Sequence, residues 1–132
     1  LVNEAASELL GVPAGVVPAP TIAQGMRGLH ERMGNARDVE LEAQQLFTTR
    51  CSTCHGAQGA GDGPASAGLT PKPRNFQDKG WQSSITDGQI EKVILEGGMA
   101  MGKSPAMPPN PDLNEKKDVV RALRAQIRGL AN

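Results

Sequence analysis

The stretch Cys51-Ser52-Thr53-Cys54-His55 reads C-x-x-C-H, and its spacing indicates a particular chemistry. On one helical turn, the two thiols lie along one edge of a porphyrin ring, where each can form a thioether with a vinyl group. The adjacent imidazole of His55 then faces the iron from below the ring. This pattern is the attachment signature of c-type haem. We therefore expect one haem c, bound covalently through Cys51 and Cys54, with His55 as an iron ligand.

Two other interpretations of the cysteine pair fit the sequence less well. A dithiol redox pair is expected near a βαβ pattern, and no alternating strand pattern of useful length occurs. A closed zinc site needs four ligands, and the one other histidine, His30, lies far upstream. Two cysteines are also too few for a disulfide scaffold. Haem attachment therefore remains the prediction.

The composition agrees with a core that a cofactor completes. The chain has 132 residues, of which only Phe47, Phe76 and Trp81 are aromatic, and it contains 16 glycines and 10 prolines. Such a chain has difficulty burying enough apolar area to offset its conformational entropy. Its 14 basic residues balance its 14 acidic ones, which argues against a nucleic-acid partner. No apolar run approaches the roughly 18 residues of a transmembrane helix.

Residues 1–37 differ from the rest and are expected to form an N-terminal extension. Thr21 looks like an N-cap, with Gln24 in the capping-box position, and opens a short helix. Gly34-Asn35 should end this helix. We expect the extension to pack on the main domain, because short connections place consecutive helices beside each other. The apolar face of the helix consists of Ile22, Met26, Leu29 and Met33.

Residues 38–132 are expected to form an all-α main domain. Its first helix should start at the N-cap Asp38 and run into Cys51. A capping box at Thr86 opens a second helix, and Asn114 should cap the last one. Long loops rich in glycine and proline separate these helices, at residues 56–84 and 99–113.

From residue 38 onward several features follow one another in a characteristic order. They are Phe47, the haem motif four residues later, Gly63-Pro64-Ala65, Pro71 to Phe76, Trp81, Gly97-Gly98 and Met107-Pro108-Pro109. In these features the chain resembles the class I monohaem cytochromes c. This resemblance implies an all-α fold whose helices wrap around one covalently bound haem. The chain departs from the family pattern at Ala43, where a glycine is usual, and at Leu123 and Ile127, which replace an aromatic partner.

The resemblance also implies a methionine as the second axial ligand of the iron, from the loop before the last helix. The loop offers Met99, Met101 and Met107. We favour Met107 because it lies closest to the final helix and because prolines stiffen its surroundings. The other two would then fill irregular gaps around the ring. His30 could replace the methionine and give bis-histidine iron, but a surface position is the more ordinary role for it.

Four further residues are candidates for the surroundings of the haem. The resemblance implies that the carbonyl of Pro64 accepts a hydrogen bond from the second ring nitrogen of His55. Arg74 and Trp81 could donate hydrogen bonds to the haem propionates. Plain core packing is an equal alternative for Trp81. Phe76 is expected to form a wall of the haem pocket.

These residues predict an electron carrier rather than an enzyme. Iron with both axial positions filled by His55 and Met107 has no open site for a substrate. Two alternatives stay open if Met107 is labile: a haem enzyme with peroxidase-like activity, or a module that binds or senses small ligands. The resemblance implies redox partner proteins and a periplasmic or otherwise extracytoplasmic location in bacteria, and we expect a monomer.

Overall fold

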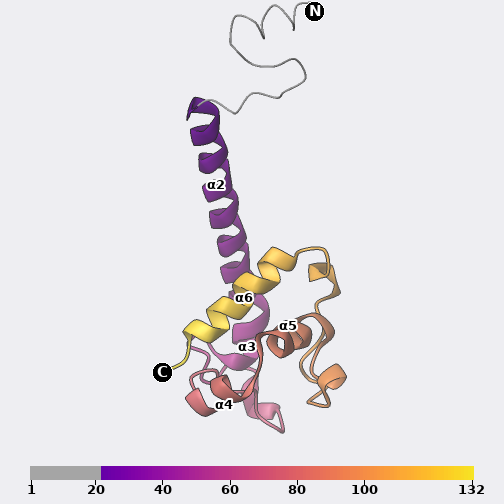
Figure 1. Ribbon diagram of the computed structural model, residues 1–132. Coiled ribbons are helices and arrows are strands. Elements are labelled where there is room, and N and C mark those ends of the chain that lie inside the picture. Colours follow the sequence, from indigo (N-terminus) through magenta and orange to yellow (C-terminus); the bar gives the residue numbers. More distant parts are fainter. Residues whose placement is uncertain (1–21) are drawn as a thin grey trace, which may run out of the picture. The chain divides into compact units, whose positions relative to one another are not determined.

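The computed structural model describes residues 22–132 (Figure 1). The chain divides into two units, Leu1–Asn35 and Ala36–Asn132. The predicted cap at Thr21 lies outside the described residues, and the packing of the extension on the main domain stays a prediction. Among the described helices, none is long and apolar enough to cross a membrane.

All regular elements of the described residues are helical, which confirms the predicted all-α class. Single turns separate the longer helices, in keeping with the many glycines and prolines of the loops. The α-helices are α2 (Ile22–Leu46), α3 (Ser52–His55), α4 (Lys79–Ser84), α5 (Asp87–Glu96) and α6 (Lys117–Gly129). The other elements are the π-helical turn η1 (Phe47–Cys51) and the 3-10 turns η2 (Ser66–Gly68), η3 (Met99–Met101) and η4 (Pro111–Leu113).

Helix α2 corrects the predicted break at Gly34-Asn35. The helix passes through these residues without interruption, and Asp38 lies inside it rather than at an N-cap. A glycine in a helix costs only about 1 kcal/mol relative to alanine. Strong helix formers on both sides of Gly34, among them Glu, Arg, Ala and Leu, outweigh that cost.

The two other predicted caps have different outcomes. The capping box at Thr86 is confirmed: Gln89 N–H donates to Thr86 Oγ1 at 3.1 Å, and Thr86 N–H donates to Gln89 Oε1 at 2.9 Å. The cap at Asn114 is wrong. Helix α6 begins only after Lys116, which makes no side-chain cap, whereas Asn114 closes η4 through its N–H bond to Pro111.

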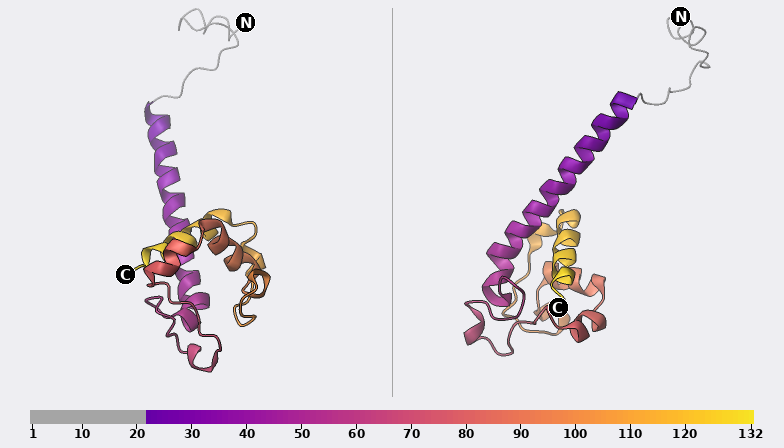
Figure 2. Two further views of the ribbon diagram at one scale, coloured as in Figure 1. Left: turned by 60° about the horizontal axis from the view of Figure 1, so that its bottom comes forward. Right: turned by 90° about the vertical axis from the view of Figure 1, so that its left-hand side faces the viewer.

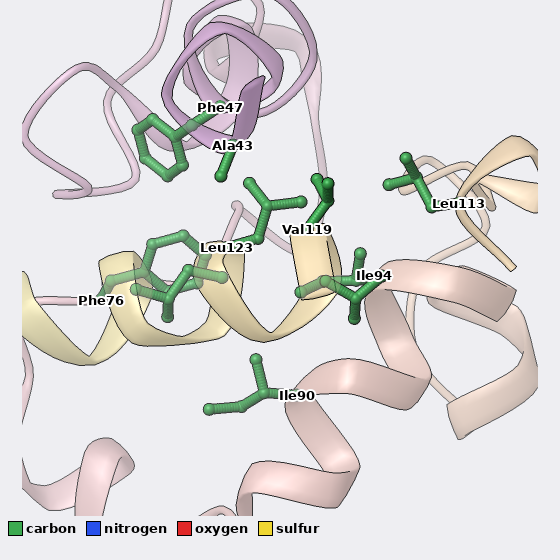
Figure 3. Packing of buried hydrophobic residues seen from close by; sticks show 10 residues of the cluster. Ala43, Phe47, Phe76, Ile90, Ile94, Leu113, Val119 and Leu123 are labelled. Carbon is green, nitrogen blue, oxygen red and sulfur yellow. The ribbon is translucent and has the colours of Figure 1, made fainter. Parts of the chain in front are cut away.

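The core of the second unit lies where α6 crosses the C-terminal part of α2, and α5 covers the other side of α6 (Figures 1 and 2). Ala43 and Phe47 face Leu123 of α6 across this crossing (Figure 3). The small side chain of Ala43 lets the two helices approach closely, and Leu123 fills the space beside Phe47. The buried cluster consists of Ala43, Phe47, Phe76, Ile90, Ile94, Leu113, Val119, Val120, Leu123 and Ile127.

Polar contacts of Arg128 and Gln82 join α4 to α6. The guanidinium of Arg128 donates to the carbonyls of Gln82 and Ile85 and to the carboxylate of Asp87. The Gln82 amide donates to the carbonyls of Phe76 and Ile127 at 2.8 and 2.9 Å. These bonds fix the segment that carries Phe76 and Trp81 against the last helix.

Candidate haem site

The C-x-x-C-H segment closes an unbroken helical run. Cys51 ends the π-helical turn η1, and Cys54 and His55 lie in α3. Turns of the π type inside helices are frequent at functional sites. Neither cysteine forms a disulfide, and both are partly buried. Burial raises the pKa of the Cys51 thiol to about 11, so that this thiol stays protonated at neutral pH.

The loop that follows α3 satisfies the carbonyls at the end of this helix. A helix leaves its last four carbonyls without partners within the helix. Here the backbone amides of one short loop turn back and meet all four, so the motif is held rigidly from its C-terminal side. The bonds are Gly56 N–H to Ser52 (2.8 Å), Ala65 N–H to Thr53 (2.8 Å), Gly63 N–H to Cys54 (3.0 Å) and Gly61 N–H to His55 (2.7 Å).

Gly63 is required by this close approach of loop and helix. A Cβ atom at this position would lie 2.3 Å from the carbonyl oxygen of Thr53 and 2.4 Å from that of Ser52. Neither backbone oxygen can move without leaving its hydrogen bond. The glycine of the sequence pattern therefore has a specific role, which is to let the loop reach the helix.

His55 has the electronic state that an iron ligand needs. Its Nδ1–H donates to the carbonyl of Arg74 at 3.0 Å, which leaves Nε2 free. Burial lowers the pKa of His55 below its ordinary value, while the Arg74 carbonyl acts in the opposite direction. The imidazole is consequently neutral at pH 7, with a lone pair on Nε2 available to a metal.

The structure corrects the predicted partner of His55. The carbonyl expected to accept from its ring was that of Pro64, but the observed acceptor is the carbonyl of Arg74. Pro64 is exposed on the capping loop. The amides of that loop cap α3, and the carbonyl that reaches Nδ1 of His55 belongs to Arg74, further along the chain.

Three of the residues singled out in the sequence gather beside His55. The ring of Phe76 is buried and stacks on the imidazole, with centroids 4.3 Å apart and an interplanar angle of 15°. The Trp81 ring lies 5.4 Å from that of Phe76, and the guanidinium carbon of Arg74 lies 5.8 Å from the Trp81 ring. The structure thus places Phe76 against His55. Its role as a wall of the haem pocket, and donation to propionates by Arg74 and Trp81, stay predictions.

The segment that carries the three candidate methionines, residues 98–107 (the methionine loop), is closed by a hydrogen bond between its first and last residues. The Met107 carbonyl accepts from Gly98 N–H at 3.0 Å. A Cβ at Gly97 would lie 3.0 Å from that carbonyl, so the loop closes only on glycine. Met101 and Met107 are partly buried, whereas Met99 is 70% exposed. The choice of Met107 as ligand stays a prediction, and the side chain of His30 lies outside the described part of the chain.

Sequence reasoning missed a link between the two ends of the site. Arg50, directly before Cys51, binds Asn110 and Asp112, which follow the methionine loop. The Asp112 hydrogen bond raises the pKa of Arg50, and the same bond lowers the pKa of Asp112. A basic residue beside the motif was the only available signal, and nothing local indicated its partners.

The residues present fit a covalently bound haem. Two thiols that are free of other bonds lie one helical turn apart, beside a neutral imidazole with one nitrogen held and the other available. Within the described residues, no group of three or more His, Cys, Asp or Glu side chains could hold a metal ion by itself. An iron bound here would need the porphyrin to supply its remaining ligands.

Comparisons with known proteins point the same way. Residues 41–131 match the family model described as Cytochrome c. A search of solved structures found a c-type cytochrome, KustC0563, at 30% sequence identity and a TM-score of 0.51. That match covers 68% of this chain and 98% of the other one. A search of the curated proteins found no significant match.

Proposed function

The chain belongs to the cytochrome c family, and from this premise we propose that it carries single electrons between redox partners on one covalent haem c. Family membership supports a haem-based electron carrier. It also agrees with the resemblance and the all-α fold expected from the sequence. The partners, the distal ligand and the place in the cell belong to the proposal.

The state of His55 carries this proposal. With Nδ1–H bound to the Arg74 carbonyl, the ring cannot rotate freely, and Nε2 presents its lone pair in a fixed direction. A carbonyl partner leaves the imidazole neutral and makes it a better donor to the metal. When bound, the haem supplies the one-electron chemistry. The protein's part is to hold the ring through Cys51 and Cys54, to orient His55, and to exclude water with Phe76.

Met107 completes the proposed ligand set on the opposite side. The support is the rigidity of its loop, which Gly98 N–H closes and which Pro108 and Pro109 stiffen. A thioether is a weak ligand, so a loop that holds it in place favours ligation over dissociation. An iron held by both His55 and Met107 would have no position left for a substrate, and would supply electron transfer alone. We therefore propose a carrier rather than an enzyme.

Covalent attachment of haem in bacteria is expected outside the cytoplasm, and a cytochrome c domain agrees with that location. We propose a periplasmic or otherwise extracytoplasmic protein that acts as a monomer. Arg74 and Trp81, which lie together beside Phe76, are the proposed partners of the haem propionates.

The distal ligand is tested by Met107→Ala, with Met101→Ala as the matched control. We expect Met107→Ala to lose the weak sulfur-to-iron charge-transfer band at the red end of the ferric spectrum, to lower the reduction potential, and to admit imidazole or cyanide. Met101→Ala should do none of these. The reverse pattern would assign the ligand to Met101. High-spin features in the unaltered protein would contradict the carrier and favour a ligand-binding or enzymatic haem.

The attachment is tested by the double variant Cys51→Ala, Cys54→Ala. It should yield no covalent haem, as judged by the mass of the denatured chain, and a poorly folded protein by circular dichroism. A stable helical protein without haem would show that the ring is not needed to complete the core.

A further inference from the structure

Arg50 makes an unusually complete set of contacts for a half-exposed side chain. Its Nη1 donates to Asp112 Oδ1 and to Asn110 Oδ1, both at 3.0 Å, and its Nη2 donates to Asp112 Oδ2 at 2.9 Å. The pair with Asp112 is bidentate, which is the geometry in which a guanidinium binds a carboxylate most specifically. Arg50 itself directly precedes the first haem-attachment cysteine.

Asn110 links Arg50 to the methionine loop. Its side-chain Nδ2 donates to the Ile94 carbonyl at 2.7 Å, and its backbone N–H donates to the Leu95 carbonyl at 3.1 Å. Two prolines alone separate Asn110 from Met107, and proline fixes its own φ angle. The position of Met107 therefore depends on where Asn110 is held.

We propose that Arg50 is a positioning residue, which holds the end of the methionine loop against the haem-attachment turn and so keeps Met107 on the iron. The proposal rests on the proposed function, because it takes Met107 as the distal ligand. Arg50 would then connect the two sides of the site, because it directly precedes Cys51 in the chain and its side chain binds Asn110 and Asp112, just after the methionine loop.

An ordinary surface ion pair would not have this effect, and the chain contains one for comparison. Arg121 and Asp118 form an exposed pair at 2.8 Å within a single helix, α6. Such a pair connects residues that the helix already holds. The Arg50 pair instead joins segments 62 positions apart in the chain.

The experiment uses the full-length holoprotein and the variants Arg50→Gln, Arg50→Lys, Asp112→Asn and Arg121→Gln. Two quantities are measured: the apparent affinity for imidazole from the haem absorption, and the hydrogen-exchange rate of the Asn110 backbone amide by NMR. Imidazole binds only after Met107 has left the iron, so its apparent affinity reports the fraction of molecules with an open loop.

We expect Arg50→Gln and Asp112→Asn to bind imidazole about two- to fivefold more tightly, the range that the loss of a half-exposed bidentate pair allows. Both should also exchange the Asn110 amide faster. Arg50→Lys should recover part of the effect, because lysine keeps the charge but not the planar fork. Arg121→Gln should match the unaltered protein in both measurements.

Each way in which the proposal could be wrong gives a different experimental result. Unchanged exchange at Asn110 in Arg50→Gln would show that Arg50 does not anchor the loop, whichever residue ligates the iron. Faster exchange with unchanged imidazole affinity would overturn the link between the anchor and ligation. Failure of the proposed function would show instead as high-spin features in the unaltered protein, whereas a sulfur-to-iron band that persists in Met107→Ala would move the distal ligand to Met101.

Discussion

The substitution Gly63→Ala tests how the haem-attachment helix is held. It adds one methyl group at the point where the capping loop meets α3. That carbon would lie 2.3 Å from the Thr53 carbonyl oxygen and 2.4 Å from that of Ser52. Carbon and oxygen atoms of neighbouring segments approach to about 3.3 Å at closest. The loop must therefore move away from the helix by about 1 Å.

This movement breaks the bonds that the loop makes at its closest point. Gly63 N–H to Cys54 and Ala65 N–H to Thr53 are the two affected first. Each is worth about 1 kcal/mol, and a carbonyl left without a partner adds to the loss. We expect the free energy of unfolding to fall by about 2–4 kcal/mol. For a domain of this size, that lowers the melting temperature by about 10–25 °C.

The assay is thermal unfolding of the holoprotein, followed by circular dichroism at 222 nm, with Gly68→Ala as the matched control. A Cβ at Gly68 meets no atom within 4 Å, so this variant should stay within about 0.5 kcal/mol of the unaltered protein. Equal melting temperatures for the two variants would refute the reasoning, because they would show that the loop does not need to approach α3 so closely.

Three further predictions concern the rest of the chain. Arg128→Gln removes a charged donor from two backbone carbonyls and from Asp87, so the free energy of unfolding in urea should fall by about 2 kcal/mol; a loss no larger than that of Arg121→Gln would contradict the role of Arg128. Arg50 lowers the pKa of Asp112 below its ordinary 3.8, so in acid the unfolded chain binds more protons than the folded one. Stability from this pair is present above about pH 4 and is lost as the pH falls through the lowered pKa. Asp112→Asn should flatten this part of the curve of urea midpoint against pH, and identical curves would exclude the pair as its source. Deletion of residues 1–37 should leave the haem spectrum nearly unchanged and lower the melting temperature, whereas a change of axial ligation would bring back His30 as a ligand.

The parts of the site that the sequence predicted are those that depend on near neighbours. The motif from Cys51 to His55 lies on a helical turn, as expected, and it could be recognised because all of its functional residues fall within five positions. The capping box at Thr86 is confirmed for the same reason, since both of its bonds join residues three apart. In such cases the local sequence already contains both partners.

Contacts between distant segments could not be predicted in this way. The acceptor for His55 is a backbone carbonyl 19 residues away, and every residue has such a carbonyl, so only the path of the loop selects that of Arg74 over Pro64. The link from Arg50 to Asp112 spans 62 residues. The break expected at Gly34 does not occur for another reason. The helix propensity of glycine is poor, but the helix formers on either side of Gly34 outweigh it.

The row of neighbouring rings His55, Phe76 and Trp81 has a practical consequence, since Trp81 is the single tryptophan of the chain. A haem bound at His55 would accept the excitation energy of the nearby Trp81 indole and quench its fluorescence in the folded protein. Unfolding would separate indole and ring and switch the emission on. The chain thus contains its own optical reporter, which requires no label and reads the integrity of this one site.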